Sequence, residues 1–195
     1  ILTILSQNTN DGNSSKAYES LRAQFPSWQA VLEAPTDAVA EAIRSGGLAN
    51  IKAPRIQHIL RQIAAERGTL TLDFLQEMPT AQAREYLLAL PGVGPKTAAC
   101  VLLFSLGREA LPVDTHVHRV ARRLGLLDAR TDAAKAHEAL EALVPPGEYY
   151  PFHLLMIQHG RTLCTARNPQ CEKCPLQSLC DYVQGAPREC PHQNP

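Results

Sequence analysis

Apolar residues recur at helical spacing along most of this sequence, and this pattern limits the fold more than any other feature. Ala17, Leu21 and Phe25 are three or four residues apart, and the same spacing runs through Ile56, Ile59 and Ile63. Strand-like alternation of apolar and polar residues is nearly absent. Proline and glycine punctuate the pattern and divide it into segments of about 8–14 residues, which is a common helix length. The sequence therefore predicts an all-α fold.

The composition excludes several classes of protein. The chain has 195 residues, of which 45% are hydrophobic and 19% charged, so it can bury a core and is not disordered. Lys and Arg number 19, as do Asp and Glu, which excludes a strongly basic coat protein for nucleic acid. No apolar run approaches the ~20 residues of a membrane-spanning helix. We expect a soluble cytoplasmic monomer, associated with the nucleoid and not with a membrane.

Basic residues are concentrated in the middle of the chain. Residues 84–135 contain eight basic and five acidic side chains, a net charge of +3. The run Arg119-Val-Ala-Arg122-Arg123 is the densest part of this excess. Such a run is usually a solvated helix face, and contact with nucleic acid is the alternative.

Four cysteines near the end of the chain indicate an inorganic site. They follow the spacing Cys-x6-Cys-x2-Cys-x5-Cys, at Cys164, Cys171, Cys174 and Cys180. A disulfide scaffold would spread its cysteines through a smaller chain. Zinc sites usually present two tight cysteine pairs, whereas one pair with two flanking cysteines favours an iron–sulfur cluster, so spacing alone leaves zinc open. Cys100 is predicted to lie in the core, and Cys190 falls outside the spacing.

A glycine-rich turn at residues 90–98 (Leu-Pro-Gly-Val-Gly-Pro-Lys-Thr-Ala) separates two predicted helices. The first, at residues 80–89, should end before Pro91, and the second, at residues 96–106, is apolar nearly all round and should be buried. The two glycines leave backbone N–H groups uncovered at a helix start, which suits a phosphate. A plain helix corner that binds nothing is the alternative.

Lys96 and Asp114 are the candidate catalytic residues. Lys96 faces the positive end of a helix dipole, which disfavours the ammonium and suits a lysine that reacts as the free amine to form a Schiff base. The alternative is a lysine that pairs with a phosphate. Asp114 precedes another helical pattern and fits an N-cap, and it can also stabilise positive charge at a reacting centre.

Together, these motifs resemble the endonuclease III branch of the helix-hairpin-helix DNA glycosylase superfamily. The resemblance rests on residues 90–98, on Val-Asp-Thr-His at 113–116, on the four-cysteine pattern, and on Ile-Leu-Ser-Gln-Asn-Thr-Asn-Asp at 4–11. It implies two lobes, a six-helix barrel at residues 1–109 and a cluster lobe at 110–195 that holds a [4Fe-4S] cluster on the four cysteines. In the family an N-terminal helix completes the cluster lobe, and we expect that helix to be missing from this sequence.

The resemblance also implies the reaction and its residues. A bifunctional DNA glycosylase/AP lyase flips an oxidised pyrimidine out of duplex DNA, with Lys96 as nucleophile and Asp114 as its carboxylate partner. A monofunctional mismatch glycosylase and a non-catalytic DNA-binding paralogue are the alternatives. The hairpin would also hold a monovalent cation. The implied DNA-contacting residues are Gln7, Asn8, Leu48, Gly92, Val93, Gly94, His116 and Arg167.

Overall fold

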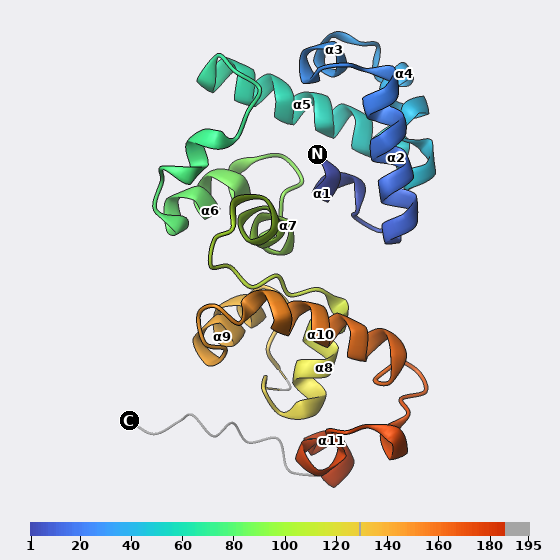
Figure 1. Cartoon of the computed structure of the whole chain (residues 1–195), viewed down its shortest axis with the longest axis vertical. Coiled ribbons are helices and arrows are strands. Elements are labelled where there is room, and N and C mark those ends of the chain that lie inside the picture. The colour runs from blue at the N-terminus through green and yellow to red at the C-terminus, as the bar shows by residue number, and fades with distance from the viewer. Residues whose placement is uncertain (129, 186–195) are drawn as a thin grey trace. The chain divides into compact units, whose positions relative to one another are not determined.

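The structure, a computed structural model, describes residues 1–128 and 130–185, so Cys190 lies outside the described residues (Figure 1). The described residues contain helices and no strand, which confirms the all-α prediction. None of their helices is long and apolar enough to cross a membrane. The α-helices are α1 (Leu2–Leu5), α2 (Asp11–Gln24), α3 (Trp28–Glu33), α4 (Thr36–Ala42), α5 (Ala49–Arg67), α6 (Thr80–Ala89), α7 (Pro95–Cys100), α8 (Thr115–Leu124), α9 (Lys135–Leu143), α10 (Tyr149–Thr162) and α11 (Asp181–Gln184). Short 3-10 turns are η1 (Arg44–Gly46), η2 (Asp73–Gln76), η4 (Cys171–Lys173) and η5 (Gln177–Leu179), and η3 (Val101–Ser105) is a π-helix.

The chain forms two compact units, Ile1–Val101 and Leu102–Pro195. The first contains α1 to α7, and the second contains α8 to α11. The lobe boundary expected after residue 109 from the family resemblance stays a prediction.

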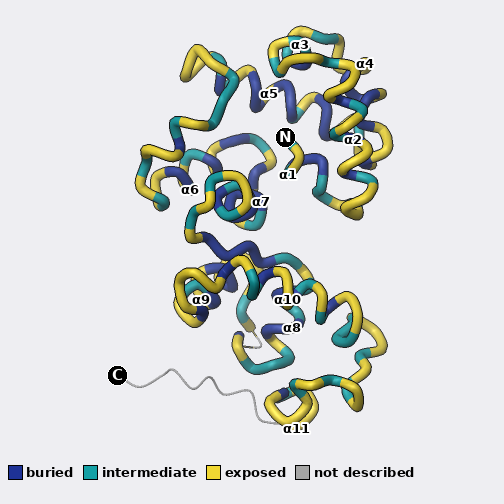
Figure 2. Tube along the Cα trace, viewed as in Figure 1, coloured by how far each residue is buried: buried dark blue, intermediate teal, exposed yellow. Residues whose placement is uncertain are grey.

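Helix α5 is the longest helix of the first unit and packs against α1, α3 and α4 (Figure 1). Its buried face carries Ile56, Leu60 and Ile63, the residues whose spacing predicted a helix, and Figure 2 shows this buried stretch. Gly68 ends the helix with a positive φ of 69°, a conformation that glycine adopts without a steric penalty. The core of this unit therefore forms around α5.

The predicted helix at residues 96–106 is only partly confirmed. Residues 95–100 form α7, and the backbone then widens into the π-helix η3. Ala98, Ala99 and Leu102 are buried, but Phe104 is 46% exposed, so the prediction of burial all round was wrong beyond Leu102. A π-turn rotates the following side chains out of the α-helical register, which explains why an unbroken apolar run does not stay inside.

The second unit is built on α8 and α10, which pack against each other. Val117, Val120 and Ala121 of α8 lie in one core with Leu140 of α9 and Met156 of α10. Gly125 ends α8 with a φ of 81°, again a left-handed cap. This core supports the cysteine-rich segment that follows α10.

Candidate functional site

The hairpin is held to the rest of the first unit by Gln7 and Arg55. Gln7 Nε2 lies 3.1 Å from both the Gly92 carbonyl oxygen and Thr97 Oγ1, and Arg55 Nη1 donates to Gln7 Oε1 at 3.0 Å. Gly92 has a φ of 72°, and a Cβ at this position would lie 2.2 Å from Arg55 Nε. Glycine is therefore favoured at residue 92 by the positive φ, and any larger residue would also displace the Arg55 side chain. Sequence reasoning missed Arg55.

Lys96 lies in the first turn of α7, directly after the hairpin. Its side chain is half-buried and forms no hydrogen bond or ion pair with another described residue. The neighbours in α7, Thr97 to Cys100, are buried and hold the helix in the core. An amine that no carboxylate neutralises is available to bind or attack a ligand.

Asp114 caps α8, as the sequence predicts. Its Oδ1 accepts hydrogen bonds from the backbone N–H groups of His116 at 2.9 Å and Val117 at 2.8 Å. Oδ2 accepts no hydrogen bond from a described residue. The cap fixes the carboxylate and leaves one oxygen free, so capping and a role in chemistry are compatible.

Asn8 and Leu48 share an unusual backbone conformation. They are the two non-glycine residues with positive φ among the described residues, at 54° and 52°. Asn8 is exposed, and Leu48 is 49% exposed although it is a large apolar residue. Such conformations cost on the order of 1–3 kcal/mol each and tend to occur at functional sites. Gln7, the neighbour of Asn8, uses its amide within the protein, which favours Asn8 as the residue that faces a ligand.

Lys52 is a buried cation that donates to the chain shortly before each of these two residues. Its Nζ donates to the Leu5 carbonyl oxygen at 2.7 Å and to the Gly46 carbonyl oxygen at 2.8 Å, and no described carboxylate pairs with it. Burial, with a smaller contribution from Arg55, lowers the pKa of Lys52. Burying a charge costs several kcal/mol, so the bonds to the two loops offset a substantial penalty. The sequence does not predict that Lys52 is buried or that it donates to these carbonyls, because a single lysine in a helical pattern is usually exposed.

The second unit gathers the four predicted cluster ligands. Cys164, Cys171, Cys174 and Cys180 line one small hollow together with apolar side chains of α8 and the C-terminal segment. None of the described cysteines forms a disulfide. No three described His, Cys, Asp or Glu side chains converge as the ligands of a single metal ion would. A hollow lined by four cysteines fits a [4Fe-4S] cluster, in which each of the four irons binds one thiolate.

Two arginines of the basic run bind this cysteine segment. Arg119 donates to the carbonyl oxygens of Gly160 at 2.9 Å and Cys164 at 3.0 Å, and Arg123 donates to Cys164 Sγ at 3.2 Å and the Thr165 carbonyl oxygen at 2.8 Å. The expectation of a fully solvated face was wrong for these two side chains, and the alternative of a contact with nucleic acid stays a prediction. Arginine can satisfy several carbonyls at once because its donors form a rigid fork.

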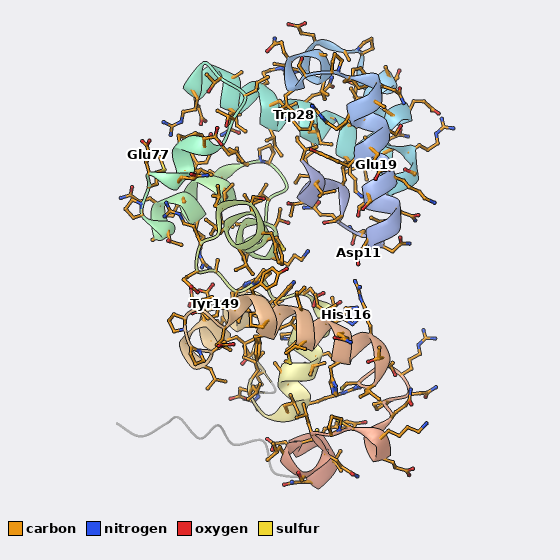
Figure 3. The ribbon with its side chains drawn as sticks, in the orientation of Figure 1. Asp11, Glu19, Trp28, Glu77, His116 and Tyr149 are labelled. Atoms are coloured by element: carbon orange, nitrogen blue, oxygen red, sulfur yellow. The ribbon has the colours of Figure 1, made fainter. Side chains whose placement is uncertain are left out.

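His116, labelled in Figure 3, lies in the first turn of α8. Its Nδ1 is 3.2 Å from Arg119 Nη2. Because arginine only donates, Nδ1 accepts, and the ring proton is carried by Nε2. Arg167 is exposed in the segment between Cys164 and Cys171. The predicted site residues are divided between the two units. The second unit contains Asp114, His116 and Arg167, and the first contains Gln7, Asn8, Leu48, Gly92, Val93, Gly94 and Lys96.

Comparisons with known proteins agree with these observations. Residues 1–146 match the family model of the HhH-GPD superfamily base excision DNA repair protein, and residues 164–180 match the iron–sulfur binding domain of endonuclease III. The cofactor of this chain is accordingly a [4Fe-4S] cluster, as the resemblance implies.

Individual relatives point the same way. Endonuclease III of Thermotoga maritima is 37% identical over 184 residues, which cover 94% of this chain and 82% of that protein. A putative DNA glycosylase of Arabidopsis thaliana is 36% identical over 190 residues; the match covers 92% of this chain, which spans 64% of the length of that relative. The structure of a trapped endonuclease III–DNA covalent intermediate matches with a TM-score of 0.81 and 32% identity, over 94% of this chain and 82% of that one. The chain belongs to the HhH-GPD superfamily of base excision DNA repair proteins, with the iron–sulfur domain of endonuclease III.

Proposed function

We propose that this protein is a bifunctional DNA glycosylase/AP lyase that removes oxidised pyrimidines from duplex DNA. The observation that carries the proposal is Lys96, a half-buried amine without a partner among the described residues, in the first turn after the hairpin. A related endonuclease III has been trapped as a covalent intermediate with DNA. A lysine amine is the group that forms such an adduct with a sugar carbon.

In this mechanism Asp114 and Lys96 act on the same sugar in sequence. As the C1′–base bond breaks, the free Oδ2 of Asp114 stabilises the positive charge that develops on the sugar. Lys96 Nζ then bonds to C1′, the sugar ring opens, and a Schiff base forms. The Schiff base acidifies C2′, and loss of that proton breaks the bond between C3′ and the 3′ phosphate oxygen, which nicks the strand. Hydrolysis of the remaining imine by water restores Lys96.

Other residues would bind and distort the DNA. Asn8 would fill the gap left by the flipped nucleotide, and Leu48 would insert on the opposite side of the stack. The backbone N–H groups around Gly92 and Gly94 would hold a phosphate, either directly or through a monovalent cation. His116 would donate from Nε2, and exposed Arg167 would contact a phosphate.

The cluster supports the fold of the second unit in this proposal. When bound, it cross-links four cysteines spread over residues 164–180 and fixes their loop. The chain's own contribution is the pair Arg119 and Arg123, which hold the carbonyl oxygens of Cys164 and Thr165 against α8.

The purified protein is expected to contain about four iron atoms per chain, because one cubane satisfies four thiolates. Cys164→Ser should reduce iron content and lower the melting temperature more than it alters the lyase reaction. Iron analysis, thermal denaturation and nicking of an abasic site measure the three quantities. Stoichiometric zinc without iron, or lost nicking with stability and iron unchanged, would contradict this expectation.

Asn8→Ala and Leu48→Ala are expected to impair base flipping and to spare bond breaking. Each should lower the single-turnover rate on a paired lesion by about tenfold or more, because misplacement of a positioning group has effects of this size. At an abasic site the base is already absent, so nicking should change much less. Equal losses on both substrates would rule out this role.

Borohydride trapping on a lesion panel tests the proposal as a whole. The iron-loaded protein is incubated with duplexes that carry an oxidised pyrimidine, a mismatched thymine or an abasic site, with and without borohydride. A covalent adduct and a nick at the oxidised pyrimidine support the proposal. Base removal without an adduct indicates a monofunctional glycosylase, and binding without either indicates a non-catalytic protein.

A further inference from the structure

Lys52 contacts the two segments that lead into the left-handed residues, at the end of α1 and at the end of η1. Its ammonium donates to Leu5, which precedes the loop of Asn8, and to Gly46, two residues before Leu48. Its own backbone N–H donates to the Leu48 carbonyl oxygen at 2.9 Å. One residue of α5 therefore bonds to Gly46 and to Leu48 and joins them to the end of α1, three residues before Asn8.

The chemistry of these contacts distinguishes Lys52 from an ordinary core residue. It is 1% exposed and is the one lysine or arginine among the described buried residues. An apolar side chain of the same length would fill the space without desolvating a charge. An apolar side chain could not donate hydrogen bonds to the carbonyl oxygens of Leu5 and Gly46, which lie far apart in the sequence.

We infer that Lys52 is a positioning residue that makes the Asn8 loop and the Leu48 loop into one rigid DNA-inserting unit. The inference rests on the proposed function and extends it to a residue that does not touch DNA. Positive φ is unfavourable for a side chain with a Cβ, strongly so for Leu48 and less so for Asn8, because asparagine enters the left-handed region more readily than leucine. If the ammonium is removed, each loop can relax toward negative φ, and Asn8 and Leu48 no longer enter the duplex together.

Gln57 provides a matched control on the same helix. It is 4% exposed, and its Nε2 donates to two backbone carbonyl oxygens, of Val31 at 3.0 Å and Ala34 at 2.7 Å. Those carbonyls lie in and directly after α3, in neither of the two loops. Gln57→Met, like Lys52→Met, removes two hydrogen bonds from a buried side chain to backbone carbonyls. It leaves the Lys52 contacts near Asn8 and Leu48 intact.

The experiment compares the iron-loaded full-length wild type with Lys52→Met and Gln57→Met well below their melting temperatures. Single-turnover rates are measured on a paired oxidised pyrimidine and on an abasic site. For Lys52→Met the ratio of the first rate to the second should fall by about tenfold or more. For Gln57→Met the ratio should stay within about twofold of the wild type, whatever its loss of stability. An unchanged ratio for Lys52→Met, or equal falls in both variants, overturns the inference.

A second readout separates this inference from the proposed function. 2-Aminopurine placed opposite a non-cleavable abasic analogue fluoresces more when the protein unstacks it, and no bond needs to break. If the wild type fails to trap or nick, the proposed function fails. The inference then stands if Lys52→Met loses the fluorescence increase while Gln57→Met keeps it. It falls if the two variants behave alike, or if the wild type shows no increase.

If Lys52→Met does not fold, a double-mutant cycle of Asn8→Ala and Leu48→Ala in the protein that keeps Lys52 tests whether the two residues act as one unit. One inserting unit predicts that Asn8→Ala and Leu48→Ala together lower the rate ratio little more than either alone. Two independent loops predict that the fold-losses multiply. Multiplicative losses overturn the inference.

Discussion

Lys96→Gln is expected to abolish both borohydride trapping and strand nicking while duplex binding stays nearly intact. Glutamine has an amide in place of the amine, and an amide nitrogen cannot attack C1′ to form a Schiff base. The side chain is half-buried and has no partner among the described residues, so the replacement breaks no internal bond. Trapping with an abasic duplex and a binding titration on a non-cleavable analogue provide the two measurements.

If Lys96 binds a phosphate instead, Lys96→Gln should weaken duplex binding and leave borohydride trapping intact. A lysine that only pairs with a phosphate would lower affinity when replaced, and the covalent adduct would still form. Lys96→Arg is a useful companion variant, because it keeps the positive charge and loses the nucleophilic amine. Trapping that survives either replacement would remove Lys96 from the reaction.

Asp114→Asn should nearly eliminate base excision while the fold persists. Asparagine keeps the size of the side chain and still accepts N–H groups at the start of α8, so the cap contacts to His116 and Val117 can remain. The variant lacks the negative charge that stabilises a cationic sugar, an effect that reaches about 3 kcal/mol, or about a hundredfold in rate, for a single preorganised group. Release of an oxidised pyrimidine under single-turnover conditions measures this loss.

Nicking at a preformed abasic site serves as the control for Asp114→Asn. No glycosidic bond remains to be broken there, so this activity should fall much less than base excision. Thermal denaturation should show a melting temperature close to that of the wild type. If Asp114→Asn unfolds, or if it excises the base at the full rate, Asp114 serves only as a helix cap and has no role in the reaction.

The sequence predicts the helical fold and the position of Asp114 because both depend on local rules. Helical spacing alone identified α5 from Ile56 to Ile63, and the first hydrogen bonds of α8 follow from an aspartate that precedes the helix. The four cysteines could be assigned to one site because their spacing limits how far apart they can lie.

Lys52 and Arg55 could not be predicted, because their roles depend on partners distant in the sequence. Lys52 contacts Leu5 across 47 residues, and Arg55 contacts Gln7 across 48. Periodicity marks which face of α5 is buried, but it does not show that a lysine on that face reaches loop carbonyls. The exposure of Phe104 was missed for a related reason, since a π-turn leaves no composition signal in an apolar run.

The hydrogen bonds of Arg119 and Arg123 to backbone carbonyls affect how strongly DNA affinity depends on salt concentration. DNA releases condensed counterions when cationic side chains neutralise its phosphates, and each such contact adds about 0.9 to the slope of log affinity against log salt. Two of the three arginines in the run at 119–123 are occupied within the protein, and Arg122 is the exposed one. Neutral donors such as hairpin N–H groups release no counterions. The run at 119–123 should therefore add no more to the salt dependence of DNA binding than the single exposed side chain of Arg122 supplies, about 0.9 in the slope.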